Sequence, residues 1–510
     1  MSHNRQLAVN MIASFISCVI VSLINFFLSP YIVSEIGIDA YGFITLGNNF
    51  ISYMSLLTIA INSLAGRFIS IQYFKKKYEE TNIYFSSVFY ANLIISIVLL
   101  FLSVIIWILL DRLINIPEHL YWDIKILFAS LFINFIINTI TSVFSVATFV
   151  TNKLYLSSIR GIEVNIIKVA LLVLLFTIFA PKVCYIGIVG IISGSYIIIY
   201  NLYYTKKFLP FLRIKTKHFN ISIVKKIFFS GIWNLITQLG VLLNEGLDLL
   251  ITNIMINPVS MGVLSISKII PSFITMIIGN LVGIFSPNFT QLYAENKKNE
   301  LIFSLKQAMK IMGIIANLPI IVLIVCGKSF FMLWQPTQDA ETLHILSIII
   351  CAGFIFNGGV NCIYDIFIVV NKLKVPAISV VITGILNIII VYILLETTDL
   401  GIFAIAGIST CLNIVKNLVL NIPYSAKCLN LKWYAFYADV VRPIVFVSIS
   451  SLLCFYLFKC INIDNNWENF ILSLMITLTI SILIALFIVL RKGDRLYIHN
   501  LIYKLLRKNG

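Results

Sequence analysis

The chain has 510 residues, of which 60% are hydrophobic and only 11% are charged. A soluble domain carries about 45–50% apolar and about 25% charged residues, so this composition excludes both an ordinary globular enzyme and a disordered chain. The net charge of +16 would suggest nucleic acid as the partner of a soluble protein. In so apolar a chain it instead indicates basic loops on the cytoplasmic face of a membrane, and no nucleic-acid partner is expected.

Apolar runs separated by polar residues predict about fourteen transmembrane helices, because one span needs roughly 20 apolar residues. The first run has no evident A-x-A cleavage site, so we expect a retained span and not a secretory signal. The predicted spans are residues 8–33, 41–66, 83–110, 122–149, 161–180, 185–204, 230–256, 260–286, 304–326, 342–370, 376–395, 401–424, 440–459 and 468–490. The sequence therefore predicts an all-α integral membrane protein.

The distribution of basic residues predicts the orientation of these spans. With the amino terminus inside, the segments on the cytoplasmic side hold 29 Lys and Arg, whereas those on the opposite side hold five. Basic residues stay on the cytoplasmic side during insertion, so both termini are expected to be cytoplasmic. All six tryptophans fall near a predicted span end or in a loop, where the indole ring is half buried and its N–H stays hydrated.

A weak internal repeat divides the chain. Gly42 recurs as Gly262 and Lys77 as Lys297, each at an offset of 220 residues. This offset favours a duplication of six helices, and two parallel halves can rock against each other around a central site. Duplication as mere growth of a helical membrane protein is the alternative. The predicted parts are an amino-terminal lobe, a carboxyl-terminal lobe, and two further helices with a basic tail: 1–215, 216–432 and 433–510.

Ionisable residues inside spans are functional candidates, since each costs at least a few kcal/mol there, and a structural ion pair is the alternative. These residues are Glu163, Lys168, Glu245, Asp248, Lys268 and Asp365. Asp248 and Lys268 lie ten residues on either side of Pro258, the predicted turn between two spans. At about 1.5 Å per residue both reach roughly 15 Å below that turn, so they can pair across the hairpin.

The carboxylates predict ion coupling. Glu245 and Asp248 are spaced i to i+3 and are expected to share one helix face. Two such carboxylates can hold a proton or coordinate Na⁺, and either would couple transport to an H⁺ or Na⁺ gradient. Asp365 is a further candidate for ion coupling. It stands near the predicted cytoplasmic mouth, where a local pair with Lys372 or simple helix packing is the alternative.

The cations predict an anion site. Glu163 is five residues from Lys168 and turned by about 140° on an ideal helix, so it is a poor partner. Lys168, facing Lys268 in the second half, is expected to bind an anionic head group, with a salt bridge to another helix as the alternative. Arg67 is retained as a further candidate at the inner end of its span, although snorkelling to the interface also explains it.

Several kinds of chemistry are excluded. The segment at Gly327 and Lys328 resembles the end of a P-loop but lacks the preceding glycine, so no Walker A motif is present. The five histidines are not spaced as metal ligands, and the nine cysteines contain no C-x-x-C. The longest loops are about twenty residues, which leaves no room for a catalytic domain. We therefore expect that the protein is not an enzyme and holds no cofactor or structural metal. Any energy for transport would come from an ion gradient or from the gradient of the substrate.

The chain resembles the polysaccharide repeat-unit flippases (O-antigen or capsule) of the multidrug/oligosaccharidyl-lipid/polysaccharide exporter superfamily. The segments that carry the resemblance are 28–33 (LSPYIV), 37–42 (GIDAYG), 244–248 (NEGLD), 263–268 (VLSISK), 286–290 (SPNFT), 371–373 (NKL) and 401–407 (GIFAIAG). One departure is at 261–264, where the family usually has a glycine followed shortly by a tyrosine. This departure affects a local helix contact.

The resemblance implies a two-lobed helical fold like that of multidrug exporters, with two additional carboxyl-terminal helices. It implies a polyprenyl-pyrophosphate-linked oligosaccharide as the substrate, flipped across the bacterial inner membrane, with membrane lipids and polysaccharide polymerase or assembly proteins as partners. Lys168 and Lys268 would attract the pyrophosphate, and the last two helices would provide a groove for the lipid tail. A cation-coupled drug exporter or a lipid II flippase of the same fold is the alternative. An enzyme that polymerises glycans is a more distant one, because the external loops are short.

Overall fold

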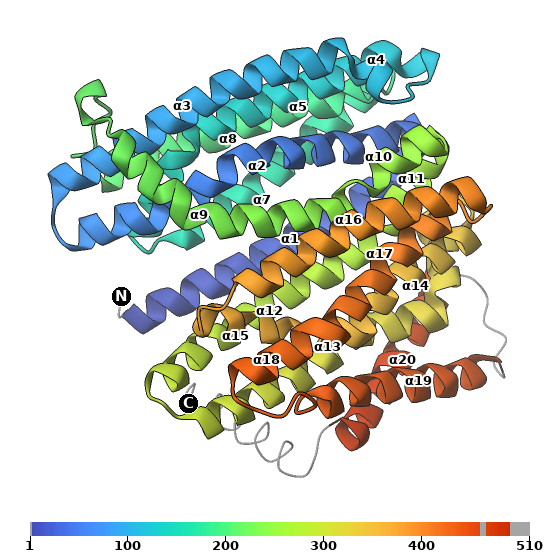
Figure 1. The fold of residues 1–510 in the computed structure, drawn as a ribbon. Helices are drawn as coiled ribbons and strands as arrows, with labels where there is room; N and C mark the ends of the chain where they lie inside the picture. The colour runs from blue at the N-terminus through green and yellow to red at the C-terminus, as the bar shows by residue number, and fades with distance from the viewer. Residues whose placement is uncertain (1–2, 460–465, 490–510) are drawn as a thin grey trace. The chain divides into compact units, whose positions relative to one another are not determined.

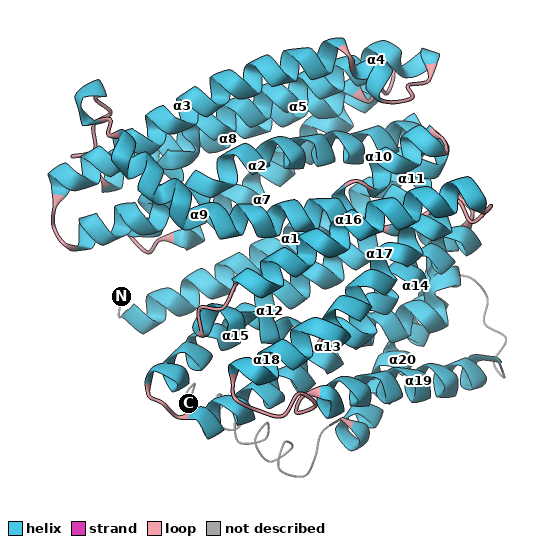
Figure 2. Ribbon diagram, in the orientation of Figure 1, coloured by secondary structure: helices cyan, strands magenta, loops and turns pink. Residues whose placement is uncertain are grey.

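The computed structural model describes residues 3–459 and 466–489. Every regular element in these residues is a helix, as Figure 2 shows. Fourteen helical segments are long and apolar enough to cross a membrane, which confirms the predicted all-α class and the predicted number of spans. The protein is therefore a multi-pass membrane protein.

Contacts divide the chain into two compact units, Met1–Ser265 and Ile266–Gly510. The predicted boundaries at 215/216 and 432/433 remain predictions. Unit 1 holds α1 (His3–Ile36), α2 (Ile38–Phe74), α3 (Tyr78–Ile108), α4 (Leu110–Leu113), α5 (Tyr121–Thr141), α6 (Val146–Val150), α7 (Leu154–Ile178), α8 (Cys184–Phe208), α9 (Ile221–Val241) and α10 (Asp248–Met255). A π-helical segment, η4 (Leu242–Gly246), joins α9 to α10, and α11 (Pro258–Ser267) runs across the boundary between the units.

Unit 2 holds α12 (Ile269–Ala294), α13 (Lys298–Trp334), α14 (Ala340–Asn357), α15 (Asn361–Val369), α16 (Lys374–Thr397), α17 (Ile402–Lys416), α18 (Ile422–Cys428), α19 (Tyr437–Lys459) and α20 (Trp467–Ile488). A second π-helical segment, η5 (Asn417–Asn421), joins α17 to α18. Within each unit the long helices run side by side (Figure 1).

In unit 1, α2 packs along α9, α5 along α8 and α1 along α7. The close approach of α2 and α9 depends on Gly231, where a Cβ atom would lie 2.1 Å from the Ala60 carbonyl oxygen. A cluster of buried side chains that includes Ile69, Phe85 and Ile227 fills the same end of the unit. Small residues let helix backbones approach in a membrane, where lipid tails are as apolar as the side chains.

In unit 2, α13 is the central helix and contacts α12, α14, α19 and α20. Phe446 of α19 and Ala485 of α20 are buried in one apolar cluster with Ile321 of α13. Pro443 also packs on Gly313, where an added Cβ would lie 2.9 Å from the proline ring. The two carboxyl-terminal helices are therefore an integral part of unit 2.

The predicted span 342–370 is not one continuous helix. α14 ends at Asn357 and α15 begins at Asn361. At Gly359 a Cβ atom would lie 2.5 Å from the Met309 carbonyl oxygen of α13, and at Gly358 it would lie 2.6 Å from Ala316 Cβ. The two glycines allow the broken helix to approach α13, and hydropathy cannot reveal such a break because both halves are apolar.

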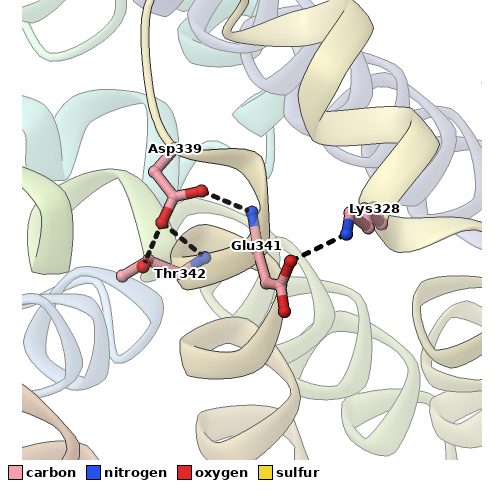
Figure 3. Close-up of polar contacts among 4 residues, drawn as sticks. All are labelled: Lys328, Asp339, Glu341 and Thr342. Atoms are coloured by element: carbon pink, nitrogen blue, oxygen red, sulfur yellow. Dashed lines mark hydrogen bonds and ion pairs between the residues drawn. The ribbon is translucent and has the colours of Figure 1, made fainter.

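The turn between α13 and α14 is stabilised by a helix cap, drawn in Figure 3. The Asp339 carboxylate accepts hydrogen bonds from the Thr342 hydroxyl and from the backbone N–H of Glu341, the latter at 3.1 Å. These bonds, the hydroxyl first, hold the pKa of Asp339 below its usual value. Beside the cap, Lys328 donates to Glu341 at 2.7 Å and ties the end of α13 to the start of α14.

Replacing Asp339 by Ala is expected to lower the Tm of the purified protein at neutral pH, because the first turn of α14 loses its acceptor. Since the pKa of Asp339 is lowered in the folded state, its contribution is present above the unfolded value of about 3.9. The Tm difference from wild type should therefore shrink as pH falls through the folded pKa. D339N, which caps without titrating, is the control in thermal unfolding at a series of pH values. A difference that does not change with pH would contradict the prediction.

Candidate functional site

The first polar site lies at the junction of η4 and α10 in unit 1. The Gly246 carbonyl at this junction accepts a hydrogen bond from the Tyr53 hydroxyl at 2.5 Å and another from Asn49 Nδ2 at 3.0 Å. Both donors are on α2, one turn apart. A buried carbonyl freed from helical bonding costs several kcal/mol in a membrane unless it finds such donors. The two side chains therefore stabilise the π-helical turn, a feature that is frequent at functional sites.

The two predicted carboxylates of this region lie in different environments. Asp248, the first residue of α10, is 2% exposed, whereas Glu245, inside η4, is exposed. The prediction that Glu245 and Asp248 share one helix face assumed α-helical spacing. A π-helical turn has more residues per turn, so the angle between the two side chains differs from that of an α-helix. Sequence spacing could not show this, because it assumes a regular helix. Their roles in ion coupling remain predictions.

A second polar group connects α7 to α8. Arg160 donates from Nη1 to the Glu163 carboxylate and lies over the ring of Tyr200, with Cζ 4.4 Å from the ring centroid. Tyr196 also donates its hydroxyl proton to Glu163 and accepts from Arg160 at 3.3 Å. The ionised pair is thus surrounded by aromatic groups. The sequence offered a signal, an Arg and a Glu three residues apart, but the tyrosines come from another helix.

The predicted anion-binding cations of unit 1, Lys168 and Arg67, form no ion pair among the described residues. Glu163 is engaged by Arg160, as the poor helical spacing to Lys168 suggests. Lys168 is half-buried in α7 and makes no ion pair within residues 3–459 and 466–489. Arg67 is exposed near the end of α2 and likewise makes no ion pair there.

The predicted Asp248–Lys268 pair joins residues of different units. Lys268 is half-buried at the junction of α11 and α12, and its carbonyl accepts from the Ser272 N–H at 3.0 Å. Asp248 belongs to unit 1 and Lys268 to unit 2. The pair therefore remains a prediction.

Asp365, on α15, is the ion-coupling candidate of unit 2. Its Oδ2 atom is buried without a hydrogen-bond partner in the described part of the chain. The alternative of a local pair with Lys372 is not formed among these residues, because α15 ends at Val369 and Lys372 is exposed in the turn beyond it. A half-buried carboxylate with one unsatisfied oxygen can accept a proton or a cation.

A third network surrounds η5. The Tyr364 hydroxyl donates to Asn417 Oδ1 at 2.8 Å, and Asn421 Nδ2 bonds the same Asn417 oxygen at 2.6 Å. The Tyr437 hydroxyl of α19 donates to the Leu418 carbonyl at 2.5 Å. Each unit therefore contains a π-helical segment with one carbonyl bonded by a tyrosine hydroxyl of another helix.

Two buried lysines of unit 2 were missed by the sequence analysis. Lys310 is 6% exposed and Lys416 is 8% exposed, and Lys416 donates to Asn413 at 2.6 Å. Both lie inside the predicted spans 304–326 and 401–424 but were assigned to the cytoplasmic basic residues. The helical segments run over Lys298–Trp334 and Ile402–Cys428, which places each lysine twelve residues from a helix end. Their position inside predicted spans was the signal that could have found them.

The described residues contain no group of three or more His, Cys, Asp or Glu that could hold a metal ion. The acidic side chains are spread over both units, with Asp248 in one and Asp365 in the other. Any cation site would therefore combine a carboxylate with hydroxyl, amide or carbonyl oxygens. Such ligand sets suit Na⁺ or a proton better than a transition metal.

The chain is similar to known proteins in sequence and in fold. No family model matches the chain. The uncharacterized membrane protein EpsK of Bacillus subtilis (strain 168) is 25% identical over 468 residues, which are 91% of this chain and 92% of that protein. An inward-closed structure of the lipid II flippase MurJ gives a TM-score of 0.70 at 16% identity and covers 94% of this chain and 98% of its own.

An inward-facing multidrug resistance MATE transporter of the MOP superfamily gives a TM-score of 0.64 at 13% identity, covering 82% of this chain and 98% of its own. A MOP superfamily transporter from Pyrococcus furiosus gives a TM-score of 0.60 at 13% identity, covering 82% and 95%. The chain therefore has the fold of MurJ and of the MATE transporters.

The Arg160–Glu163 pair is expected to be energetically coupled. In a double-mutant cycle, E163Q leaves a partly buried guanidinium without its counter-charge, and R160Q leaves the carboxylate without its own. The summed losses of unfolding free energy in the two single variants should therefore exceed the loss in the double variant. We expect a coupling free energy of about 0.5–3 kcal/mol. The measurement is the unfolding free energy of the four proteins in the same detergent. Strict additivity of the two changes would show that the pair is not coupled.

Proposed function

We propose that this protein is a flippase that moves polyprenyl-pyrophosphate-linked oligosaccharide repeat units across the bacterial inner membrane for O-antigen or capsule synthesis. The carrying observation is the shared fold with MurJ, whose name describes it as a lipid II flippase, over nearly the whole of both chains. Rocking of two helical halves would provide alternating access. The protein is proposed to act as a transporter, not an enzyme.

The extent of the structural match favours a lipid-linked substrate over a soluble one. The MurJ match covers 94% of this chain and the MATE match 82%, a difference of about 60 residues out of 510. That difference is about the size of the segment of α19 and α20, Tyr437–Ile488. These helices pack on α13 and expose large apolar side chains such as Tyr456 and Phe487, which suits an apolar lipid tail.

The proposed pyrophosphate site uses the cations Lys168, Lys268 and Arg67. Lys168 is half-buried in a membrane-spanning helix and has no ion pair within the described ranges, so an anion would offset its desolvation. Lys268 lies at the break between α11 and α12. Arg67, exposed at the predicted cytoplasmic end of α2, would meet the head group first.

Ion coupling is proposed for Asp365, Asp248 and Glu245. Asp365 has a buried, unsatisfied carboxylate oxygen, and Asp248 is almost fully buried beside the π-helical turn. Protonation or Na⁺ binding at such a carboxylate removes a buried negative charge, which would favour one packing of the surrounding helices over another. An H⁺ or Na⁺ gradient would then drive the flip without a cofactor.

A cation-coupled drug exporter is the second candidate function, favoured by the MATE-like fold. A lipid II flippase is the third, favoured by the MurJ match. A drug exporter would need an acidic cavity for organic cations, whereas the half-buried candidates Lys168 and Lys268 are basic. The proposed location is the bacterial inner membrane, with both termini cytoplasmic. Polysaccharide polymerase and assembly proteins are the proposed partners.

Deleting the gene in its native host is expected to trap complete lipid-linked repeat units on the cytoplasmic face of the inner membrane. The measurement separates lipid-linked glycans by their accessibility to an external glycosidase in spheroplasts, alongside a count of surface polymer. Restoration by the wild-type gene is the control. Single repeats on the outer face would indicate a polymerase, and normal glycans with altered drug sensitivity would indicate the exporter. Loss of cell-wall precursor transport would indicate the lipid II flippase.

The same strain tests the cation site. The double variant K168Q/K268Q should fail to restore surface polymer although it reaches the membrane in normal amount, because the pyrophosphate loses its counter-charges. The matched control is K182Q, which removes an exposed loop lysine. Full restoration by the double variant would exclude these lysines from substrate binding.

Replacing Asp365 by Asn should abolish the gradient dependence of flipping in proteoliposomes, because the amide can neither take up a proton nor neutralise Na⁺. Flipping of lipid-linked oligosaccharide is followed with an imposed H⁺ or Na⁺ gradient and without one. D399N removes an exposed acid and serves as the matched control. A D365N protein that still responds to both gradients would show that this carboxylate does not couple transport.

A further inference from the structure

A surface hollow of about 550 Å³ lies where η5 and α18 meet the turn into α19. All of its lining residues belong to unit 2. The elements around it follow one another in the chain at the predicted cytoplasmic end of the unit, and Figure 1 shows the chain running from α18 through a turn into α19. Its lining includes neither Asp365 nor any of the candidate cations.

Most of the lining of the hollow is apolar or aromatic. This part consists of Val419 and Leu420 of η5, Pro423 and Tyr424 of α18 and Leu431 of the turn. Val419 is 71% exposed, and Val415, one turn earlier, is also exposed. The two valines form an apolar strip that leads along the helix into the hollow.

The rest of the lining is polar and cationic. Lys427, Asn430 and Trp433 supply an ammonium group, an amide and an indole N–H. Each of these side chains is exposed. Lys427 makes no hydrogen bond or ion pair within residues 3–459 and 466–489, so its ammonium group is available to a ligand.

The segment that lines the hollow carries only positive charge. Residues 416–436 contain three lysines and no Asp or Glu. The next acid in sequence, Asp439, lies 3.7 Å from Arg442 and is 4% exposed. An anion in the hollow would therefore meet no competing carboxylate from this segment.

The hollow is joined to the network around η5. The exposed Trp433 ring packs edge-on against Tyr437, with centroids 5.7 Å apart. Tyr437 in turn donates to the Leu418 carbonyl of η5. A ligand that orders Trp433 would thereby hold the tyrosine that stabilises the π-helical segment.

We propose that this hollow binds the phosphodiester head group of an anionic phospholipid from the cytoplasmic leaflet. The phosphate would be held by Lys427, with Asn430 and the Trp433 indole as further donors, and an acyl chain would lie along Val415 and Val419. One lysine in the lining matches the single negative charge of a phosphodiester better than the higher charge of a pyrophosphate. Tryptophan and lysine at a membrane interface fit this occupant.

The test uses the full chain in nanodiscs of phosphatidylcholine, with and without phosphatidylglycerol, and native mass spectrometry after release. Phosphatidylglycerol should remain bound to the wild-type protein and raise its Tm. K427Q should weaken retention about fivefold, and K427R should preserve it. The matched control K432Q removes an equal charge five residues away that does not line the hollow, and it should change retention less than twofold.

Three outcomes would overturn the proposal. Equal losses in K427Q and K432Q would show general surface attraction and no defined site. Equal retention of phosphatidylcholine and phosphatidylglycerol would exclude charge recognition. Stronger binding of a prenyl pyrophosphate than of phosphatidylglycerol, lost in K427Q, would assign the hollow to a pyrophosphate lipid instead. Because phosphatidylglycerol binding is measured without transport, these results are independent of whether the flippase proposal holds.

Discussion

The need to bond every backbone polar group without water governs this molecule. Regular helices meet it internally, and a chain that is 60% hydrophobic has no other economical arrangement in a bilayer. Departures from regular helix require donors from elsewhere. Tyr53 and Asn49 supply them to Gly246 in unit 1, and Tyr437 supplies one to Leu418 in unit 2. The irregular turns are therefore stabilised by specific side chains and stand where conformational change can be localised.

The same scarcity of water determines how charges are arranged. Arg160 is neutralised by Glu163 and surrounded by tyrosine rings, which makes it a structural element of the α7–α8 hairpin. Lys168, two turns further along, has no such partner in the described residues. A charge that the protein does not neutralise itself is the one best suited to an external ion. This contrast distinguishes structural charges from candidate functional ones.

The two carboxyl-terminal helices are an integral part of the fold. α19 and α20 are built into the apolar cluster of unit 2 through Phe446 and Ala485. Tyr437, the first residue of α19, reaches the π-helical segment η5. The additional helices are thus connected directly to the polar network of unit 2, so a lipid held near them could influence that network.

Composition and hydropathy were sufficient to predict the all-helical class and fourteen spans, because each span's apolar length is a local property of the sequence. Through-space contacts decided the rest. The break at Gly358 and Gly359 depends on the approach of α13. The burial of Lys310 and Lys416 depends on the helices that pack around α13 and α17, and the different environments of Glu245 and Asp248 depend on a π-helical turn. No periodicity argument contains these features, since each arises where one helix meets another.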